Sequence, residues 1–415
     1  MEKNMANVKI SFIGDIMCEK PLLNAALKND NTYDFDSVFC SMKKVFMKSD
    51  YIVGNLETVC AGEKLGYTNH IYSFNTPEEF IKSIKNSGVD LVTTATNHCL
   101  DRGVEGLKNN LATLKKYKLD NIGTHDSIEE REQVFVKDFN GIKVAFLNYT
   151  YGTNTLINEV ILNKNERFHV NLLKPQCEEI KKLEKKLTSK SLKSRIARTI
   201  FKIITVEQWI RLKRTLGLAY KKAYQDDSLE GIDQDYLEQI KLDIQKAKAK
   251  SDFVIMCMHS GGQFNVEPGK FSKFMMNFMK ENGVNVVVGN HPHIVQKCER
   301  FSTGMIGAYS LGNFSISPSS VYILHENLPE YSIMMHIYLE KNKNNIRLSK
   351  ATFSILKIIE SKNHNLTVYP VIELIKKAKD EKEKKELIND VTIIYNRFLN
   401  KNIKNIEIRD EFIIE

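Results

Sequence analysis

The sequence contains no apolar run that approaches the roughly 20 consecutive residues that a membrane-spanning helix needs. The first residues, MEKNMANVKISFIGD, have no long apolar core and no small-residue cleavage site, so they are not typical of a signal peptide. These absences predict a cytoplasmic protein. A protein without a spanning helix can still bind to the membrane surface, so peripheral association stays open.

Paired cysteines are also missing. The seven Cys are odd in number, lie far apart in the sequence and form no CxxC motif, which favours reduced thiols over a disulfide framework. Proline is scarce, with 8 residues, and the 42% hydrophobic and 27% charged composition is that of a globular protein. A chain of 415 residues is long enough for one large α/β domain with attachments, or for two ordinary domains.

The net charge of +9 comes from one segment. Residues 181–222 hold fourteen Lys or Arg and two Glu, whereas the rest of the chain holds 46 basic and 49 acidic residues. The segment is helical in pattern and contains the only Trp, Trp209, so we expect a basic helical insertion over 176–226. It fits a lid with a solvated basic face, or a helix lying on an anionic membrane through 181–222. Nucleic acid is not expected, because no recognisable binding module accompanies the basic patch.

Short apolar runs that end in polar residues form the dominant pattern. Five of them are KISFIG before Asp15, YIVG before Asn55 and Glu57, VDLVTTA before Asn97 and His98, FVIMCM before His259, and NVVVG before His291 and His293. Runs of this kind predict buried strands, and the helical patterns between them predict parallel βαβ units. Because ligands bind at the carboxyl ends of parallel strands, we expect these polar side chains to converge.

The residue types at these strand ends are those of a metal site. Asp and Glu carboxylates with neutral imidazoles suit Mn, Fe or Zn. Two such ions about 3.5–4 Å apart are a common device for cleaving phosphate esters. One carboxylate bridges the ions, and an unligated His protonates the leaving oxygen. A single motif of this set is explained equally well by loop or cap residues, but five together favour the metal site.

A hairpin adds antiparallel pairing to the expected sheet. Asn140-Gly141 separates the runs QVFVKDF and IKVAFLNYT, which is a strong hairpin signal. A mixed sheet or a two-sheet sandwich therefore fits better than a simple doubly wound fold. The tail, 340–415, has strand-like runs and a charged helix, and it is expected to be a small accessory extension.

The ordered set Gly14-Asp15, GNLE (54–57), Asn97-His98, His259 and GNHPH (289–293) resembles the calcineurin-like metallophosphoesterases. With ATNHCLDRGVEG, HPHIVQ and YSLGNF it is most similar to their capsule-synthesis branch, the CapA or poly-γ-glutamate biosynthesis family. The resemblance covers roughly 7–335 outside the insertion. It implies a four-layer αββα sandwich with mixed sheets, the helical insertion and the small C-terminal extension.

The resemblance also implies residue roles. Asp15 and His293 would hold one divalent ion, Asn97, His259 and His291 a second, and Glu57 would bridge them. His98 would be the acid, assisted by Asp101. Asn55, Asn75, Tyr309 and Asn313 would contact substrate, Asn55 also orienting its neighbours.

The implied function is that of a metal-dependent hydrolase in capsule or poly-γ-glutamate synthesis, acting on a phosphoester or on an amide of the anionic polymer. The superfamily often has His two residues after the first Asp, where this chain has Met17, and a thioether is a poor ligand for these ions. Met17 therefore favours an alternative, a non-catalytic protein that binds the polymer or helps to assemble a synthesis complex.

Overall fold

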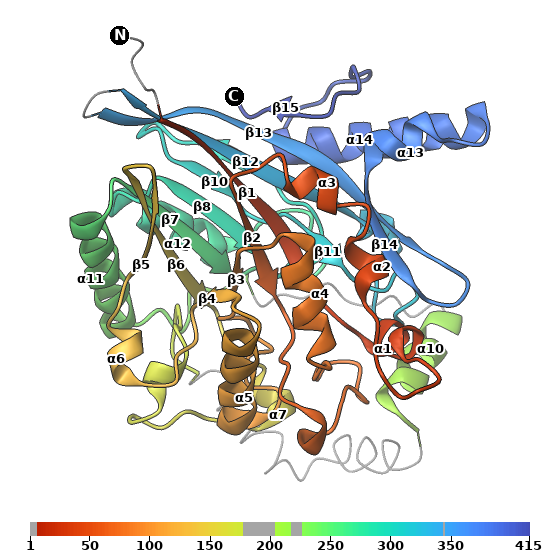
Figure 1. Ribbon diagram of the computed structural model, residues 1–415, viewed down its shortest axis with the longest axis horizontal. Coiled ribbons are helices and arrows are strands. Elements are labelled where there is room, and N and C mark those ends of the chain that lie inside the picture. Colours follow the sequence, from red (N-terminus) through yellow and green to blue (C-terminus); the bar gives the residue numbers. More distant parts are fainter. Residues whose placement is uncertain (1–5, 177–203, 217–225, 343–344) are drawn as a thin grey trace.

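The computed structural model describes residues 6–176, 204–216, 226–342 and 345–415. These residues form a nine-stranded and a six-stranded sheet that face each other (Figure 1). The larger sheet contains β1 (Ala6–Ile16), β2 (Tyr51–Leu56), β3 (Leu91–Thr93), β4 (Asp120–Ile122), β11 (Asn313–Ser315), β12 (Tyr331–Asn342), β13 (Asn345–Glu360), β14 (Leu366–Pro370) and β15 (Phe412–Ile413). The smaller contains β5 (Phe135–Phe139), β6 (Ile142–Thr150), β7 (Phe253–His259), β8 (Val286–Asn290), β9 (Cys298–Arg300) and β10 (Ile306–Ala308).

Both sheets are mixed, as the sequence predicts. Strands β1 to β4 run parallel, as do β6, β7, β8 and β10, whereas β12, β13 and β14 are antiparallel. The predicted hairpin joins β5 to β6, and Asn140 and Gly141 adopt φ of 54° and 85°, as a tight two-residue turn requires. Strand-end residues of the two parallel sets therefore face one edge of the sandwich.

Helices cover both outer faces of the sandwich. The helices of the described residues are α1 (Lys20–Ala26), α2 (Asp36–Phe39), α3 (Lys43–Phe46), α4 (Glu79–Ser87), α5 (Gly103–Lys116), α6 (Ile128–Arg131), α7 (Thr155–Asn158), α10 (Val206–Thr215), α11 (Gln234–Lys250), α12 (Lys270–Glu281), α13 (Val371–Lys376) and α14 (Glu381–Leu399). Apolar residues of α1, α2 and α4 pack on the larger sheet, and those of α11 and α12 on the smaller. A third cluster fills the space between the sheets. The four-layer αββα order is confirmed.

Helix limits follow local signals. Asp233 caps α11, because its carboxylate accepts hydrogen bonds from the backbone N–H of Asp235 and Tyr236. Helix α4 begins at Glu79 and ends where Gly88 takes φ of 104°.

The C-terminal region completes the larger sheet. Strand β13 pairs with β12 from Tyr331 to Asn342, and β14 and β15 pair with β13. Helix α14 contributes Val391, Ile394 and Phe398 to the apolar cluster that includes residues of both sheets. The basic insertion lies largely outside the described residues, which include only 204–216 of its central part.

A close approach of two strands sets the position of the first strand end. A Cβ atom at Gly14 would lie 1.9 Å from the carbonyl oxygen of Gly312, so only glycine fits there. The backbone N–H of the next residue, Asp15, donates to that same carbonyl at 3.0 Å. Glycine thus allows β1 and the segment before β11 to hold Asp15 at the edge of the sandwich.

Candidate metal centre

The polar strand ends converge, as the sequence predicts. Asp15 and Glu57 come from β1 and the residue following β2 in the larger sheet, and Asn97 follows β3. His259 ends β7 in the smaller sheet, and His291 and His293 follow β8. All six side chains are at most 1% exposed. Two sheets therefore supply one buried cluster of carboxylates, imidazoles and an amide.

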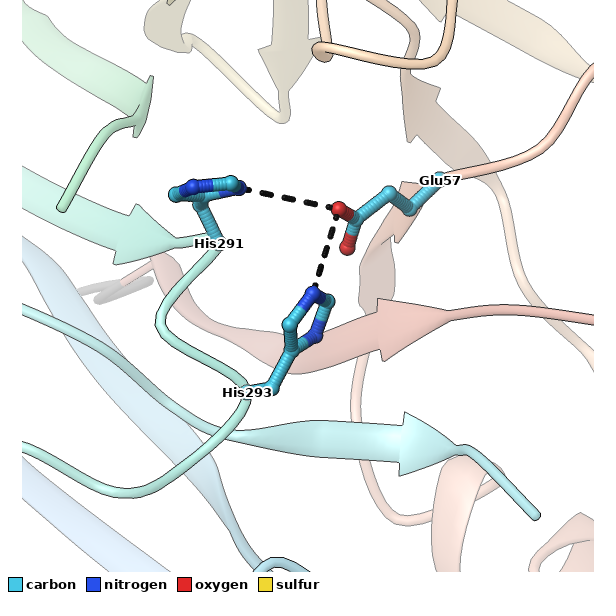
Figure 2. Close-up of side chains that lie close together, drawn as sticks. All are labelled: Glu57, His291 and His293. Atoms are coloured by element: carbon cyan, nitrogen blue, oxygen red, sulfur yellow. Dashed lines mark ion pairs between the residues drawn. The ribbon is translucent and has the colours of Figure 1, made fainter. Parts of the chain in front are cut away.

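Glu57 lies at the middle of this cluster. Its Oε1 atom is 3.4 Å from His259 Nε2, 3.8 Å from His291 Nδ1 and 3.6 Å from His293 Nε2. Figure 2 shows Glu57 and the rings of His291 and His293 directed toward one another. One carboxylate therefore lies within reach of three imidazoles from another sheet.

Two pairs of neighbours flank Glu57. His293 Nδ1 lies 3.4 Å from Asp15 Oδ2, and His259 Nε2 lies 2.7 Å from Asn97 Oδ1. Ligand atoms of Glu57, His291 and His293 lie within 4.8 Å of one another, as do those of Asp15, Glu57 and His259. Glu57 belongs to both groups, which is the position that a bridging ligand would occupy.

The donor atoms fit divalent cations. Neither oxygen of Glu57 and neither ring nitrogen of His291 has a hydrogen-bond partner, although both side chains are fully buried. Leaving such buried groups unpaired costs free energy, and native proteins rarely do so without a reason. A cation bound by these atoms removes that cost. Carboxylate, amide oxygen and imidazole together suit Mn, Fe or Zn.

Burial controls protonation at the centre. It lowers the pKa of His259 and His291 well below the usual range, and the neighbouring histidines lower it further. Both rings are therefore neutral near pH 7, which is the form that binds metal. Burial, then Asp15, raises the pKa of Glu57 well above its usual range. A nearby cation would favour the ionised carboxylate.

The backbone around the two histidines of GNHPH is unusual. His291 has φ of 101° and His293 has φ of 60°, a region that residues other than glycine seldom adopt. Strained positions of this kind persist where the surroundings hold them, and they are concentrated at functional sites. Here they accompany two imidazoles that both lie close to Glu57.

His98 lies beside this group and pairs with Asp101. Its Nδ1 atom is 2.7 Å from Asp101 Oδ2, which also accepts a hydrogen bond from the backbone N–H of Phe74. The Phe74 ring lies 4.4 Å from the imidazole, centroid to centroid. A proton at Nδ1 would thus be held by Asp101, which leaves Nε2 on the other side of the ring.

Two residues expected to contact substrate, Asn75 and Tyr309, are buried. Tyr309 packs in the apolar cluster between the smaller sheet and α12, and its hydroxyl donates to Glu299. Asn75 is fully buried, and its amide bonds to the backbone of Ala61, Gly62 and Gly66. The structure thus gives both polar groups protein partners, and substrate contact by either residue stays a prediction.

Asn55 and Asn313 instead contact the proposed ligands. Asn55 Nδ2 donates to Asp15 Oδ1 at 2.8 Å and lies 3.3 Å from His259 Nδ1. Asn313 Oδ1 lies 3.0 Å from His293 Nδ1, and its amide nitrogen donates to the His293 carbonyl. Both are buried and occupied by these contacts. Met17 lies in the apolar cluster under α1, α2 and α4.

The loop Tyr151–Asn154 also borders the centre, although it is not among the residues predicted from sequence. The Tyr151 ring lies 4.6 Å from that of His291, and Asn154 lies against Asn97 and His98. The signal was present, because these residues follow β6 as the other polar motifs follow their strands. The hairpin signal lies at the start of β6, whereas this loop follows the end of β6.

The model of the family "Bacterial capsule synthesis protein PGA_cap" matches residues 9–318. The chain belongs to this family. Its match includes every strand end that contributes to the centre.

Two curated relatives are named for capsule or PGA biosynthesis. "Capsule biosynthesis protein CapA" of Bacillus anthracis is 23% identical over 317 residues, 75% of this chain and 61% of that protein. "PGA biosynthesis protein CapA" of Bacillus subtilis (strain 168) is 22% identical over 306 residues, 73% of this chain and 62% of that protein. The chain thus spans less than two thirds of the length of either relative.

Two solved structures are distantly similar to this PGA_cap chain. A putative 5'-nucleotidase from Staphylococcus aureus has a TM-score of 0.43 at 14% identity, covering 92% of this chain and 58% of that one. The calcineurin-like phosphoesterase YfkN from Bacillus subtilis has a TM-score of 0.41 at 12% identity, covering 92% and 99%. At these TM-scores and identities, the likeness says nothing about the chemistry of this chain. No helix within the described part of the chain is both long and apolar enough to cross a membrane.

Proposed function

We propose that this member of the PGA_cap family is a divalent-metal-dependent hydrolase that acts on an anionic capsule polymer or on a phosphoester formed during its synthesis. The observation that carries the proposal is Glu57, whose two carboxylate oxygens lie buried among histidines without a hydrogen-bond partner. Family membership supports the capsule setting.

The ligand assignment gives each flanking pair its own ion and adds His291 to the pair of His259, because its ring lies 4.9 Å from that of His259 and 5.8 Å from that of His293, centroid to centroid. Asp15 and His293 would hold one ion, Asn97, His259 and His291 the other, and Glu57 both. Two divalent ions would supply Lewis acidity at the bond to be cleaved. The centre holds three buried carboxylates, those of Asp15, Glu57 and Asp101. Within the described residues, their ion-pair partners are histidines, and none of them pairs with a Lys or Arg. The need for positive charge supports two ions of Mn, Fe or Zn.

The remaining chemistry belongs to the chain itself. Asp101 orients His98 by accepting from Nδ1, so that a proton carried on Nε2 of the doubly protonated ring would be the one given to the leaving group, leaving the ring neutral. Asn55 and Asn313 orient Asp15, His259 and His293 through hydrogen bonds. Burial of all these groups excludes bulk water and strengthens their electrostatic interactions.

One observation favours the alternative, a non-catalytic polymer-binding or assembly protein. Met17, at the place where the superfamily often has a ligand His, is 1% exposed and packed among apolar side chains. The first ion would therefore be held by fewer imidazoles than the second. Membrane contact through 181–222 stays a prediction, because most of that segment lies outside the described residues.

The decisive experiment measures metal and hydrolysis together. Chelator-treated protein would be loaded with Mn²⁺ and assayed for bound metal, for hydrolysis of a generic phosphodiester and monoester, and for shortening of poly-γ-glutamate. His291→Ala is the test variant, and His325→Ala, at an exposed position, is the matched control. Two ions per chain with activity lost only in His291→Ala supports the hydrolase. Bound metal without hydrolysis of any of the three favours the alternative, and absence of bound metal in the parent ends the catalytic proposal.

A further inference from the structure

Asn154 lies between two of the groups that the proposed function uses. Its Oδ1 atom accepts a hydrogen bond from Asn97 Nδ2 at 3.1 Å, and its Nδ2 atom lies 3.3 Å and 3.5 Å from the two ring nitrogens of His98. The residue is 56 positions from His98 and 57 from Asn97 in sequence. Only the packing of the loop after β6 against the loop after β3 brings the three together.

The contact with Asn97 determines which way that amide faces. Asn97 Oδ1 lies 2.7 Å from His259 Nε2, at the centre, while Asn97 Nδ2 is directed to Asn154. The carbonyl oxygen is the only metal-binding atom of an asparagine amide. By accepting from Nδ2, Asn154 keeps that oxygen turned toward the proposed ion.

The contact with His98 involves the opposite end of the Asn154 amide. Because Oδ1 accepts from Asn97, the NH₂ group faces the imidazole. Asn154 Nδ2 lies 3.3 Å from Nδ1 and 3.5 Å from Nε2, so the amide packs against the ring near both nitrogens, while Asp101 holds Nδ1 at 2.7 Å. The contact therefore fixes the position of the ring whose Nε2 the proposed function assigns to proton transfer.

The loop is built so that the side chain is free for this task. Asn154 occupies the N-cap of α7 with φ of 53°, yet its side chain makes no capping hydrogen bond. Other side chains hold the loop: Asn158 Nδ2 donates to the Thr153 carbonyl at 2.6 Å, and Gln176 Nε2 donates to Thr153 Oγ1 at 2.5 Å. The Tyr151 N–H donates to the His259 carbonyl at 3.0 Å.

We infer that Asn154 is a positioning residue of the metal centre, which orients Asn97 as a ligand and His98 for proton transfer. This inference rests on the proposed function. It extends the centre to a residue outside the strand-end motifs that defined it.

Three variants separate these roles. Asn154→Gly removes the amide without imposing strain, because glycine adopts a positive φ freely. Asn154→Asp keeps an acceptor for Asn97 Nδ2 but removes the NH₂ group beside His98. Asn163→Gly is the matched control, since Asn163 is exposed and makes no contact with Asn97 or His98 in the described structure.

The primary measurement is Mn²⁺ affinity by calorimetry on chelator-treated protein, with circular dichroism to check folding. Loss of an outer contact to a ligand typically costs 10–100-fold in affinity. We expect roughly tenfold weaker binding in Asn154→Gly, affinity no weaker than the parent in Asn154→Asp, and no change in Asn163→Gly. Turnover of a phosphodiester should fall in both Asn154 variants, with KM of Asn154→Asp close to that of the parent.

The outcomes are distinct. Asn154→Gly with the parent's Mn²⁺ affinity overturns the inference and leaves the proposed function intact. Equal weakening in Asn154→Gly and Asn154→Asp also overturns it, because the acceptor would then be irrelevant. A parent that binds no Mn²⁺ overturns the proposed function and this inference with it.

Discussion

His98 Nδ1 lies 2.7 Å from Asp101 Oδ2, and both side chains are almost fully buried beside the candidate metal centre. The pair forms within one turn, three residues apart, and the Phe74 N–H donates to the same carboxylate oxygen. The spacing makes the pair local, whereas its position beside His259 and Asn97 depends on the packing of the two sheets.

This pair leads to the first prediction. Asp101→Asn keeps the size of the side chain but removes the carboxylate that holds the Nδ1 proton, so turnover of a phosphodiester should fall by about 10²-fold. The loss should be smaller for substrates with a good leaving group, which needs less protonation. Steady-state kinetics on two esters of different leaving-group pKa measures this. Asp126→Asn, at an exposed site, is the control, and equal losses on both esters would contradict the assigned role.

Glu57→Gln should separate metal binding from folding. The amide removes the negative charge shared by both ligand groups, so Mn²⁺ affinity should fall by about 10–100-fold or more. The metal-free variant should be at least as stable as the metal-free parent, because a buried carboxylate without a hydrogen-bond partner is replaced by a neutral group. Calorimetry and urea unfolding test both statements. Glu63→Gln, at an exposed position, is the control, and unchanged Mn²⁺ affinity in Glu57→Gln would exclude Glu57 as a ligand.

Bound metal should raise the Tm of the protein, and the size of the rise should depend on which ion is added. An ion bound only by the folded state at 100 times its Kd adds about 2.7 kcal/mol to the free energy of unfolding. Because the centre combines imidazoles with carboxylates, Mn²⁺ and Zn²⁺ should raise Tm more than Ca²⁺ does. Thermal scans of chelator-treated protein with each ion measure the effect. His291→Ala should lose most of the shift, and an equal response to Ca²⁺ would show that another site is responsible.

Glu411 offers a prediction about pH that is independent of the centre. Burial raises the pKa of Glu411, but His336 and hydrogen bonds from Lys9, Thr352 and Tyr338 together lower it to about 2. A folded-state pKa below the unfolded value means that the ionised group stabilises the protein above about pH 4.5. That stabilisation is lost as the pH falls from about 4.5 toward 2.

The matching variant is Glu411→Gln. At pH 7 the free energy of unfolding should fall by about 1–2 kcal/mol, since the carboxylate is partly exposed and its charge is screened. The difference from the parent should shrink steadily in urea unfolding measured between pH 4.5 and pH 3. Glu407→Gln, an exposed partner of Arg409, should change the stability by less than about 0.5 kcal/mol. A pH-independent difference for Glu411→Gln would refute the assignment.

Much of the fold was open to prediction because its signals are local. The apolar runs that became β1, β2, β7 and β8 carry their own strand pattern, and Asn140-Gly141 carries the hairpin. Since parallel strands expose their carboxyl ends at one edge, the convergence of Asp15, Glu57 and His259 followed from the same pattern. The residue types then indicated divalent metal.

The tertiary structure decided the contacts that no local pattern contains. Asn97 and His259 are 162 residues apart, and their approach depends on how the two sheets face each other. The direction of Tyr309 into the cluster under α12, the closure of a loop around Asn75 and the placement of Asn154 against His98 also depend on long-range packing. The sequence by itself thus determined which side chains stand at the strand ends. Only the packing of sheets and loops determined which of them meet, because side-chain direction and loop path are set by neighbours distant in the chain.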